Sequence, residues 1–233
     1  MKKLQFSVLA ASLFFAGAQA QAVTMTVDAK SNIFGAGLSV APAPGGGGAG
    51  LLPAAYNFTA SAGNVLTFSS VSGQIGCCGP NGGMAGADGA RWRTLVPSFG
   101  GISGVNHSDR FMFMVGVFLS DAAPGATAPA VLNFSDANDF SQLAPQIGQT
   151  FFIGDGRNAQ GQIQQFIAPS NASRLYLGFV DAYNFNAAPG YYADNVGALQ
   201  ANFQIAAVPE AETWAMMLGG LSVLGALARR RKA

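Results

Sequence analysis

The chain has 233 residues, of which 50% are hydrophobic and only 10% are charged, and its formal net charge is +1. Between residues 21 and 207, six basic residues stand against nine aspartates and no glutamate, which gives this part a formal charge of −3. A weakly acidic region with scattered arginines argues against nucleic acid as a partner, because such a partner needs clustered positive charge.

The first 20 residues have the layout of a secretory signal peptide. Two lysines precede an apolar run at residues 6–16, and the small residues Ala18 and Ala20 offer an A-x-A cleavage site. As a helix, this run is too short to span a bilayer. We expect residues 1–20 to form a signal peptide helix that signal peptidase removes, so that the mature chain begins at or near Gln21. A retained N-terminal anchor is the alternative.

Short runs rich in Val, Phe, Ile and Thr, separated by Gly, Pro and Asn, predict β-strands in the rest of the chain. In chain order, the clearest runs lie at residues 24–28, 65–68, 111–119, 150–153, 163–167, 174–180 and 198–205. The uninterrupted apolar run at 111–119 predicts a strand that is buried on both faces. We therefore predict an all-β fold, a jelly-roll-like β-sandwich of about eight or nine strands at residues 21–207.

Two segments between these runs are rich in glycine. Residues 41–48 combine Ala-Pro repeats with four consecutive glycines, which predicts a surface loop or linker. Residues 75–89 predict a long loop, the kind of segment in which binding groups are often found. This second loop holds Cys77 and Cys78, the only cysteines. In an oxidising compartment they can form a strained vicinal disulfide or pair with another chain, and free thiols are the third alternative.

The inventory of reactive side chains argues against an enzyme. His107 is the only histidine, and residues 21–207 contain no glutamate. A catalytic triad or an acid–base pair is therefore hard to assemble, and we predict no catalytic and no cofactor-binding residues. A secreted glycosidase that uses a pair of aspartates is the remaining enzymatic alternative.

The C-terminal residues form a polar acidic break, an apolar segment and a basic end. The apolar segment at 213–228 predicts a hydrophobic helix about 24 Å long, shorter than a hydrocarbon core of about 30 Å. Trp214 suits one membrane interface, and the basic residues 229–232 should stay on the cytoplasmic side. We expect a marginal helix that anchors the chain only transiently in the inner membrane.

The order of these features resembles the PEP-CTERM sorting tail over residues 208–233. The residues that carry the resemblance are Pro209, Glu210, Trp214, Arg229, Arg230 and Arg231. One departure is Ala211, where this family usually has a second proline. The resemblance implies recognition by an exosortase-type membrane enzyme of bacteria that make exopolysaccharide, and delivery to the envelope, cell surface or extracellular matrix. An ordinary C-terminal anchor is the alternative.

The central region resembles the calcium-dependent galactophilic lectins of bacteria, which are jelly-roll sandwiches of the galactose-binding-like type. The matching pieces, in order, lie at residues 64–68, 76–80, 163–172, 175–181 and 189–199. The resemblance implies one Ca²⁺ held by the side chains of Asp181, Asp194 and Asn195, with main-chain oxygens near Tyr191 and Cys78.

This oxygen-only ligand set is chemically reasonable for calcium. Ca²⁺ takes about six to eight oxygen ligands, so two carboxylates would neutralise it and leave positions for sugar hydroxyls. The stretch from Asp181 to Asp194 is longer than in those lectins, and Asp194 stands where asparagine is usual. The alternative is that Asp181, Asp194 and Asn195 only cap turns, as these residue types often do.

The resemblance also predicts sugar contacts for Asp181, Asn195 and Tyr192. Aromatic residues near Asp181 could stack on a sugar or cover an edge of the core; they are Tyr183, Phe185, Tyr191 and Tyr192. Together these features predict an exported protein with a calcium-dependent carbohydrate-binding sandwich, whose partner is a carbohydrate or exopolysaccharide. A structural biofilm or matrix protein without a ligand is the alternative.

Overall fold

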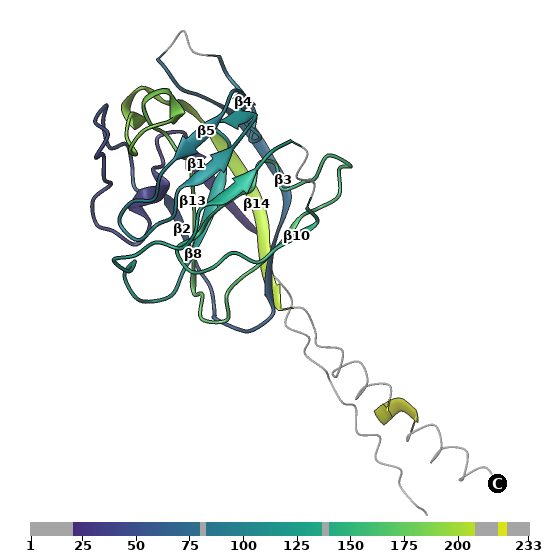
Figure 1. The fold of residues 1–233 in the computed structure, drawn as a ribbon. Helices are drawn as coiled ribbons and strands as arrows, with labels where there is room; N and C mark the ends of the chain where they lie inside the picture. The colour runs from purple at the N-terminus through teal and green to yellow at the C-terminus, as the bar shows by residue number, and fades with distance from the viewer. Residues whose placement is uncertain (1–20, 80–82, 137–139, 208–218, 223–233) are drawn as a thin grey trace, which may run out of the picture.

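The structure, a computed structural model, describes residues 21–79, 83–136, 140–207 and 219–222 (Figure 1). The predicted signal peptide at 1–20 lies outside the described residues. Of the predicted tail helix at 213–228, only residues 219–222 are described, and these are helical.

Two larger sheets form the body of the protein. The five-stranded sheet has the order β1 (Val23–Asp28), β14 (Val196–Ala207), β3 (Asn64–Gly76), β12 (Gln165–Ile167) and β10 (Gln142–Leu143). The four-stranded sheet has the order β11 (Thr150–Phe152), β8 (Val115–Leu119), β13 (Arg174–Gly178) and β2 (Ala54–Asn57). All neighbours are antiparallel except β10 and β12.

Smaller elements complete the described fold. One sheet joins β5 (Thr94–Val96), β6 (Val105–His107) and β9 (Leu132–Phe134), and another joins β4 (Ala90–Arg91) and β7 (Arg110–Phe111). The short 3₁₀ helices are η1 (Ile33–Gly35), η2 (Tyr183–Phe185) and η3 (Tyr192–Asp194).

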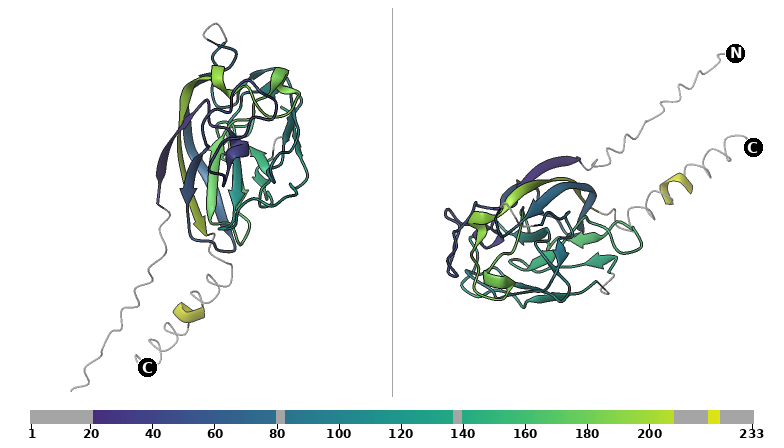
Figure 2. Two further views of the ribbon diagram at one scale, coloured as in Figure 1. Left: turned by 90° about the vertical axis from the view of Figure 1, so that its left-hand side faces the viewer. Right: turned by 90° about the horizontal axis from the view of Figure 1, so that it is seen from above.

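Aromatic side chains fill the space between the two larger sheets. The rings of Phe151 on β11 and Phe166 on β12 lie 5.1 Å apart, and those of Tyr56 on β2 and Phe203 on β14 lie 5.4 Å apart. Fully burying one such phenylalanine contributes about 1.5–3 kcal/mol. The left view of Figure 2 shows the two layers from the side. The predicted all-β sandwich is confirmed.

The apolar run at 111–119 is divided between two strands. Met112 has a positive φ of 51°, which ends β7 and separates it from β8. Every residue of β8 is buried, as we expect for a strand covered on both faces. Interruptions of this kind raise the number of strands in the described residues to fourteen, so the predicted eight or nine was too low.

The long β3–β14 pair determines which loops meet at one end of the sandwich. In its antiparallel register Gly76 lies opposite Val196. Cys77, which follows β3, and Asn195, which precedes β14, therefore lie at the same end of the sheet. In Figure 1, β14 runs beside β3 along the length of the domain.

The glycine-rich segment at 41–48 is a surface loop, one of the two predicted alternatives, and it packs against the protein instead of forming a linker. The Gly45 amide donates to the Pro189 carbonyl (2.8 Å), and the Tyr191 amide donates to the Gly46 carbonyl (2.9 Å). Gly47 has a φ of +64°, and a Cβ there would lie 2.5 Å from the Tyr191 ring. The glycines are therefore needed for close contact with the loop that precedes β14.

Candidate functional site

A cavity of about 350 Å³ lies at the end of the sandwich where β3 ends and β14 begins. Its lining includes Cys78, Asp181, Tyr191 and Asp194, four of the five residues predicted to bind calcium. The fifth, Asn195, follows Asp194 directly and is fully buried. The structure thus brings together residues from three separate parts of the chain.

The chain reaches this cavity through a tight return between Asp181 and Asp194. Asp181 follows the buried strand β13, and its carbonyl accepts a hydrogen bond from the Gly190 amide (3.0 Å). Its own amide donates to the Tyr192 hydroxyl (3.1 Å). These two bonds hold both ends of the longer connection close together.

Two buried side-chain oxygens at this site have no hydrogen-bond partner among the described residues. Asp181 is 2% exposed; its Oδ1 accepts from the Ala182 amide (2.7 Å), while Oδ2 is unpaired. Asn195 is 0% exposed; its Nδ2 donates to the Ala29 carbonyl (3.1 Å), while Oδ1 is unpaired. A buried polar atom without a partner costs about 1–3 kcal/mol. Both oxygens are therefore candidate ligand atoms.

The surroundings of Asp181 disfavour its ionised form. Burial raises the pKa of Asp181 to about 8, although the Asn195 side chain and the Ala182 amide oppose this effect. The negative charge of Asp194 raises the pKa of Asp181 further. A cation between the two carboxylates would offset both the burial of Asp181 and its repulsion by Asp194.

A disulfide joins Cys77 and Cys78 in one wall of the cavity. Cys77 is buried, whereas Cys78 is exposed and has a φ of +70°. The next residue, Gly79, donates its amide to the Asp194 carbonyl (3.2 Å). The disulfide loop is therefore tied directly to the segment that carries Asp194.

The aromatic residues near Asp181 fall into two groups. Tyr183 is 59% exposed beside the cavity, and its ring centroid lies 5.5 Å from that of Tyr191. Phe185 is buried and packs 4.7 Å from Phe111, so it covers the core.

The prediction that Tyr192 contacts a sugar is wrong. Its ring is fully buried, and its hydroxyl donates to the Phe179 carbonyl (3.1 Å) while accepting from the Asp181 amide. Burial also raises the pKa of Tyr192 well above its ordinary value, so the phenol stays neutral. Tyr192 therefore positions Asp181 and has no surface available to a ligand.

Trp92 lines the same cavity and was not predicted as a site residue. It is 61% exposed, a large fraction for a tryptophan, and it follows β4 in a different part of the chain. Its exposure could not be read from the sequence, and no local pattern connects Trp92 to Asp181.

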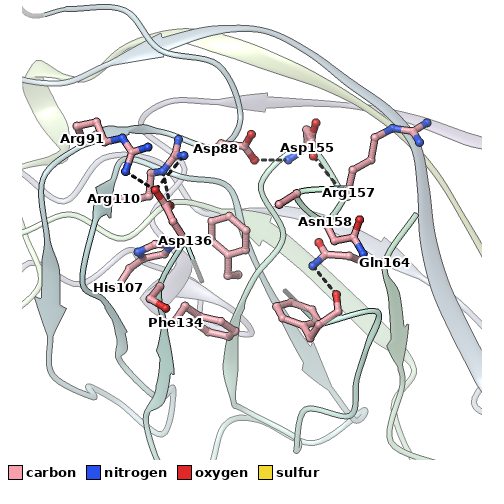
Figure 3. A pocket seen from close by; sticks show the side chains of 14 residues that line it. Asp88, Arg91, His107, Arg110, Phe134, Asp136, Asp155, Arg157, Asn158 and Gln164 are labelled. Carbon is pink, nitrogen blue, oxygen red and sulfur yellow. Dashed lines mark hydrogen bonds and ion pairs between the residues drawn. The ribbon is translucent and has the colours of Figure 1, made fainter. Parts of the chain in front are cut away.

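A second cavity, of about 330 Å³, contains more charged groups (Figure 3). Asp136 accepts hydrogen bonds from Arg110 Nε (2.7 Å) and from Arg91. Across the cavity, Asp88 Oδ1 accepts from the Asp155 amide (2.9 Å). Burial, the largest effect, raises the pKa of Asp88.

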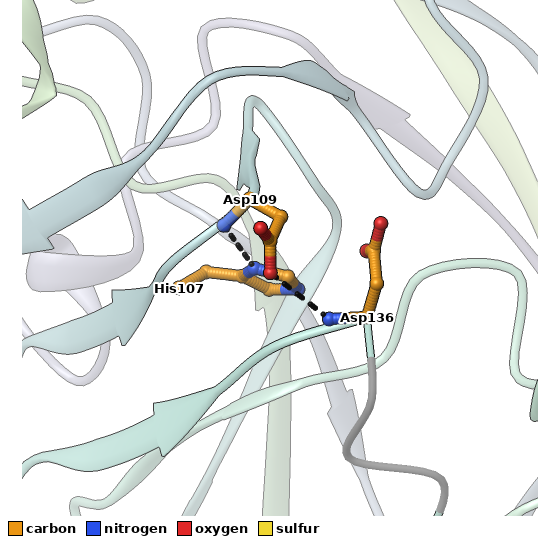
Figure 4. Close-up of side chains that lie close together, drawn as sticks. All are labelled: His107, Asp109 and Asp136. Atoms are coloured by element: carbon orange, nitrogen blue, oxygen red, sulfur yellow. Dashed lines mark hydrogen bonds between the residues drawn. The ribbon is translucent and has the colours of Figure 1, made fainter.

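His107, Asp109 and Asp136 form a second candidate metal site (Figure 4). One potential ligand atom of each residue lies within 4.8 Å of those of the other two. The existing bonds argue against that role. His107 Nδ1 accepts from the Asp109 amide (3.2 Å), and two arginines already neutralise Asp136. Burial lowers the pKa of His107, so the imidazole is neutral near pH 7.

The C-terminal tail matches a known protein family. The family model for the PEP-CTERM protein-sorting motif matches residues 207–232. The match includes all the predicted sorting residues, which lie outside the described residues: Pro209, Glu210, Trp214, Arg229, Arg230 and Arg231. The protein is thus exported across the inner membrane and sorted by an exosortase-type enzyme to the cell envelope or surface.

No curated protein and no solved structure matches the chain. Within the described part of the chain, no helix has the length and apolar character needed to span a membrane.

Proposed function

We propose that the protein is a calcium-dependent carbohydrate-binding protein of the cell envelope or extracellular matrix, and that it is not an enzyme. The observation that carries this proposal is the pair of buried, unpaired oxygens, Asp181 Oδ2 and Asn195 Oδ1. Both belong to residues that the lectin resemblance assigns to the metal.

The donor set at this end of the sandwich fits calcium better than a transition metal. Asp181, Asp194 and Asn195 offer side-chain oxygens, and main-chain oxygens near Tyr191 and Cys78 would add to them. Calcium prefers such hard oxygen ligands, whereas zinc and copper prefer imidazole and thiolate. Both cysteines are held in a disulfide, so neither offers a thiolate.

Bound calcium would supply open coordination positions for two neighbouring hydroxyls of a sugar. The exposed rings of Trp92 and Tyr183 stand beside the same cavity and present apolar faces to a ligand. A sugar has both hydroxyls and apolar C–H faces, so it matches a metal with aromatic neighbours.

The test is a calcium titration of the mature chain by calorimetry, followed by a glycan array read in calcium and in chelator. We expect one calcium per chain and sugar binding that disappears in chelator. Asp181→Asn should abolish both, and the exposed Asp28→Asn should leave both unchanged as a matched control. A folded protein that binds neither calcium nor glycans would instead support the ligand-free structural matrix protein.

A further inference from the structure

The second cavity is separate from the candidate calcium site, because the two share no lining residue. Its walls come from β4, β7 and β9 on one side and from the turn before β12 on the other, as Figure 3 shows through Arg91, Arg110, Asp155 and Gln164. Nothing in the proposed calcium chemistry uses these residues.

Gln164 is the most informative residue in this cavity. It is 2% exposed, and its Nε2 donates to the Phe140 carbonyl (3.0 Å). This bond fixes the orientation of the amide, since a flipped amide would face one oxygen with another. Oε1 then has no partner among the described residues. A ligand that satisfies it must donate a hydrogen bond, which a fully deprotonated anion such as sulfate or acetate does not do.

The charges around the cavity balance. Three arginines and three aspartates (Asp88, Asp136 and Asp155) line it. Arg91 and Arg110 bond to Asp136, whereas the guanidinium of Arg157 points away and donates to the Gly161 and Ser69 carbonyls. His107, buried against Phe113 and Phe152, adds no charge near pH 7 because burial lowers its pKa. A balanced set of donors and acceptors suits a neutral ligand that offers both kinds of hydrogen bond.

Aromatic residues provide an apolar wall beneath these polar groups. Phe134, Phe140 and Phe152 all line the cavity, and the ring of Phe134 lies 5.9 Å from each of the other two. A volume of about 330 Å³ lies at the small end of the range for small-molecule sites, about 300–1,000 Å³.

We infer that this cavity is a calcium-independent binding site for a neutral saccharide unit. The hydroxyls of such a unit donate to Gln164 Oε1 and the aspartates, and they accept from Arg91 and Arg110. Its C–H face packs on the phenylalanine rings. This site needs no metal, so evidence against the proposed calcium site would not count against it.

The experiment is saturation-transfer NMR of the mature chain in chelator with glucose, galactose, mannose, cellobiose, maltose and lactose. Acetate and sulfate, which have no hydrogen-bond donor, serve as anionic probes. We expect at least one neutral sugar to bind and neither anion to compete with it. Gln164→Met, which removes the unpaired acceptor, should weaken binding about fivefold to tenfold.

Two further variants separate binding from folding. Arg91→Met changes a mostly exposed side chain, so it should fold normally and weaken binding several-fold. Gln160→Met makes the same chemical change as Gln164→Met at an exposed position outside the cavity, and it should have no effect. The inference is overturned if no neutral sugar binds in chelator, or if the anions bind and the sugars do not. It is also overturned if Arg91→Met and Gln164→Met both bind like the wild type.

Discussion

Asp181 and Asn195 are each held in place through one side-chain atom, while the other oxygen is left buried and unpaired. When Asp181 is ionised, this arrangement opposes folding, because each unpaired oxygen loses its hydration. Calcium bound at this point would give both oxygens a partner. The free-energy cost of these unpaired oxygens in the metal-free protein is therefore what we expect at a binding site.

The raised pKa of Asp181 predicts an unusual dependence of stability on pH. Its folded-state pKa of about 8 lies above the ordinary value of 3.8, so the metal-free folded state holds a proton that the unfolded state releases. The stability that Asp181 contributes should therefore fall as pH rises from about 4 to about 8, and level off above that.

Urea denaturation in chelator at several pH values measures this effect. Asp181→Asn cannot ionise and should lack this part of the pH dependence, so its curve should diverge from that of the wild type. Parallel curves for the two proteins between pH 4 and pH 8 would show that Asp181 ionises normally.

The disulfide makes a separate prediction at residue level. Non-reduced mature protein should contain no thiol that alkylates, and its mass should correspond to a monomer with one internal bridge. Reduction should loosen the loop that Gly79 ties to Asp194 and thus weaken calcium binding. Two alkylated thiols per chain in the non-reduced sample would contradict the vicinal disulfide.

The sequence allowed several site residues to be predicted, but not how each one is used. Asp181 and the Asp194-Asn195 pair follow or precede strands with clear patterns, so their positions relative to those strands could be foreseen. Tyr192 differs from Tyr191 only in whether it points into the core, and no local pattern separates two adjacent tyrosines. Trp92 reaches the site through tertiary contacts with residues almost ninety positions away.

At the level of elements, the segment at 45–50 and the loop before β14 support each other. Tyr192 donates its amide to the Gly48 carbonyl (3.1 Å), and Gly45 donates its amide to the Pro189 carbonyl (2.8 Å). Glycine allows this close packing of two loops, and the packing fixes the backbone next to Asp194.

A pair of glycine variants should separate close packing from backbone strain. Gly50→Ala places a Cβ 2.3 Å from the Lys30 carbonyl oxygen and 2.5 Å from Tyr192 Cβ, at a φ of +68°. Gly46→Ala has a similar φ of +82° but meets nothing within 4 Å. In both variants the left-handed backbone should lower the free energy of unfolding by about 1–2 kcal/mol. In Gly50→Ala the close contacts should lower it by about 1–3 kcal/mol more. Equal losses in urea denaturation would contradict the packing role.

Strand prediction succeeded where hydrophobic patterning and pairing agree. The run at 198–205 lies within β14, and the run at 24–28 lies within β1. The run at 65–68 marks only the start of β3, which continues to Gly76 through exposed Ser and Gly residues. Those residues are typical of a loop, and only pairing with β14 makes them a strand.

For the whole molecule, the two cavities are adjacent through β4. Arg91 lines the second cavity, and the next residue, Trp92, lines the candidate calcium site. If both sites bind saccharide units, a polysaccharide that reaches across this strand would bind more tightly than either unit alone, by effective concentration. An exported surface protein would meet such polymers at its destination.

The sorting tail should govern how the chain is released. Deleting residues 208–233 should give a soluble secreted domain, because the helix and the basic end are then missing. The full chain should pass through a membrane-bound form in a host that has the sorting enzyme. Fractionation and terminal mass spectrometry check this. A full chain that never appears in membranes and retains Arg229 to Lys232 would contradict the sorting route.

The most direct test of the calcium site is the melting temperature of the mature chain in excess calcium and in chelator. A ligand that binds only the folded state at a hundredfold excess over its dissociation constant contributes about 2.7 kcal/mol. For a domain of this size that corresponds to a rise of about 5–10 °C. Asp181→Asn should lose most of this rise. Identical melting temperatures of the wild type in calcium and in chelator would contradict the calcium site, and with it the proposed function.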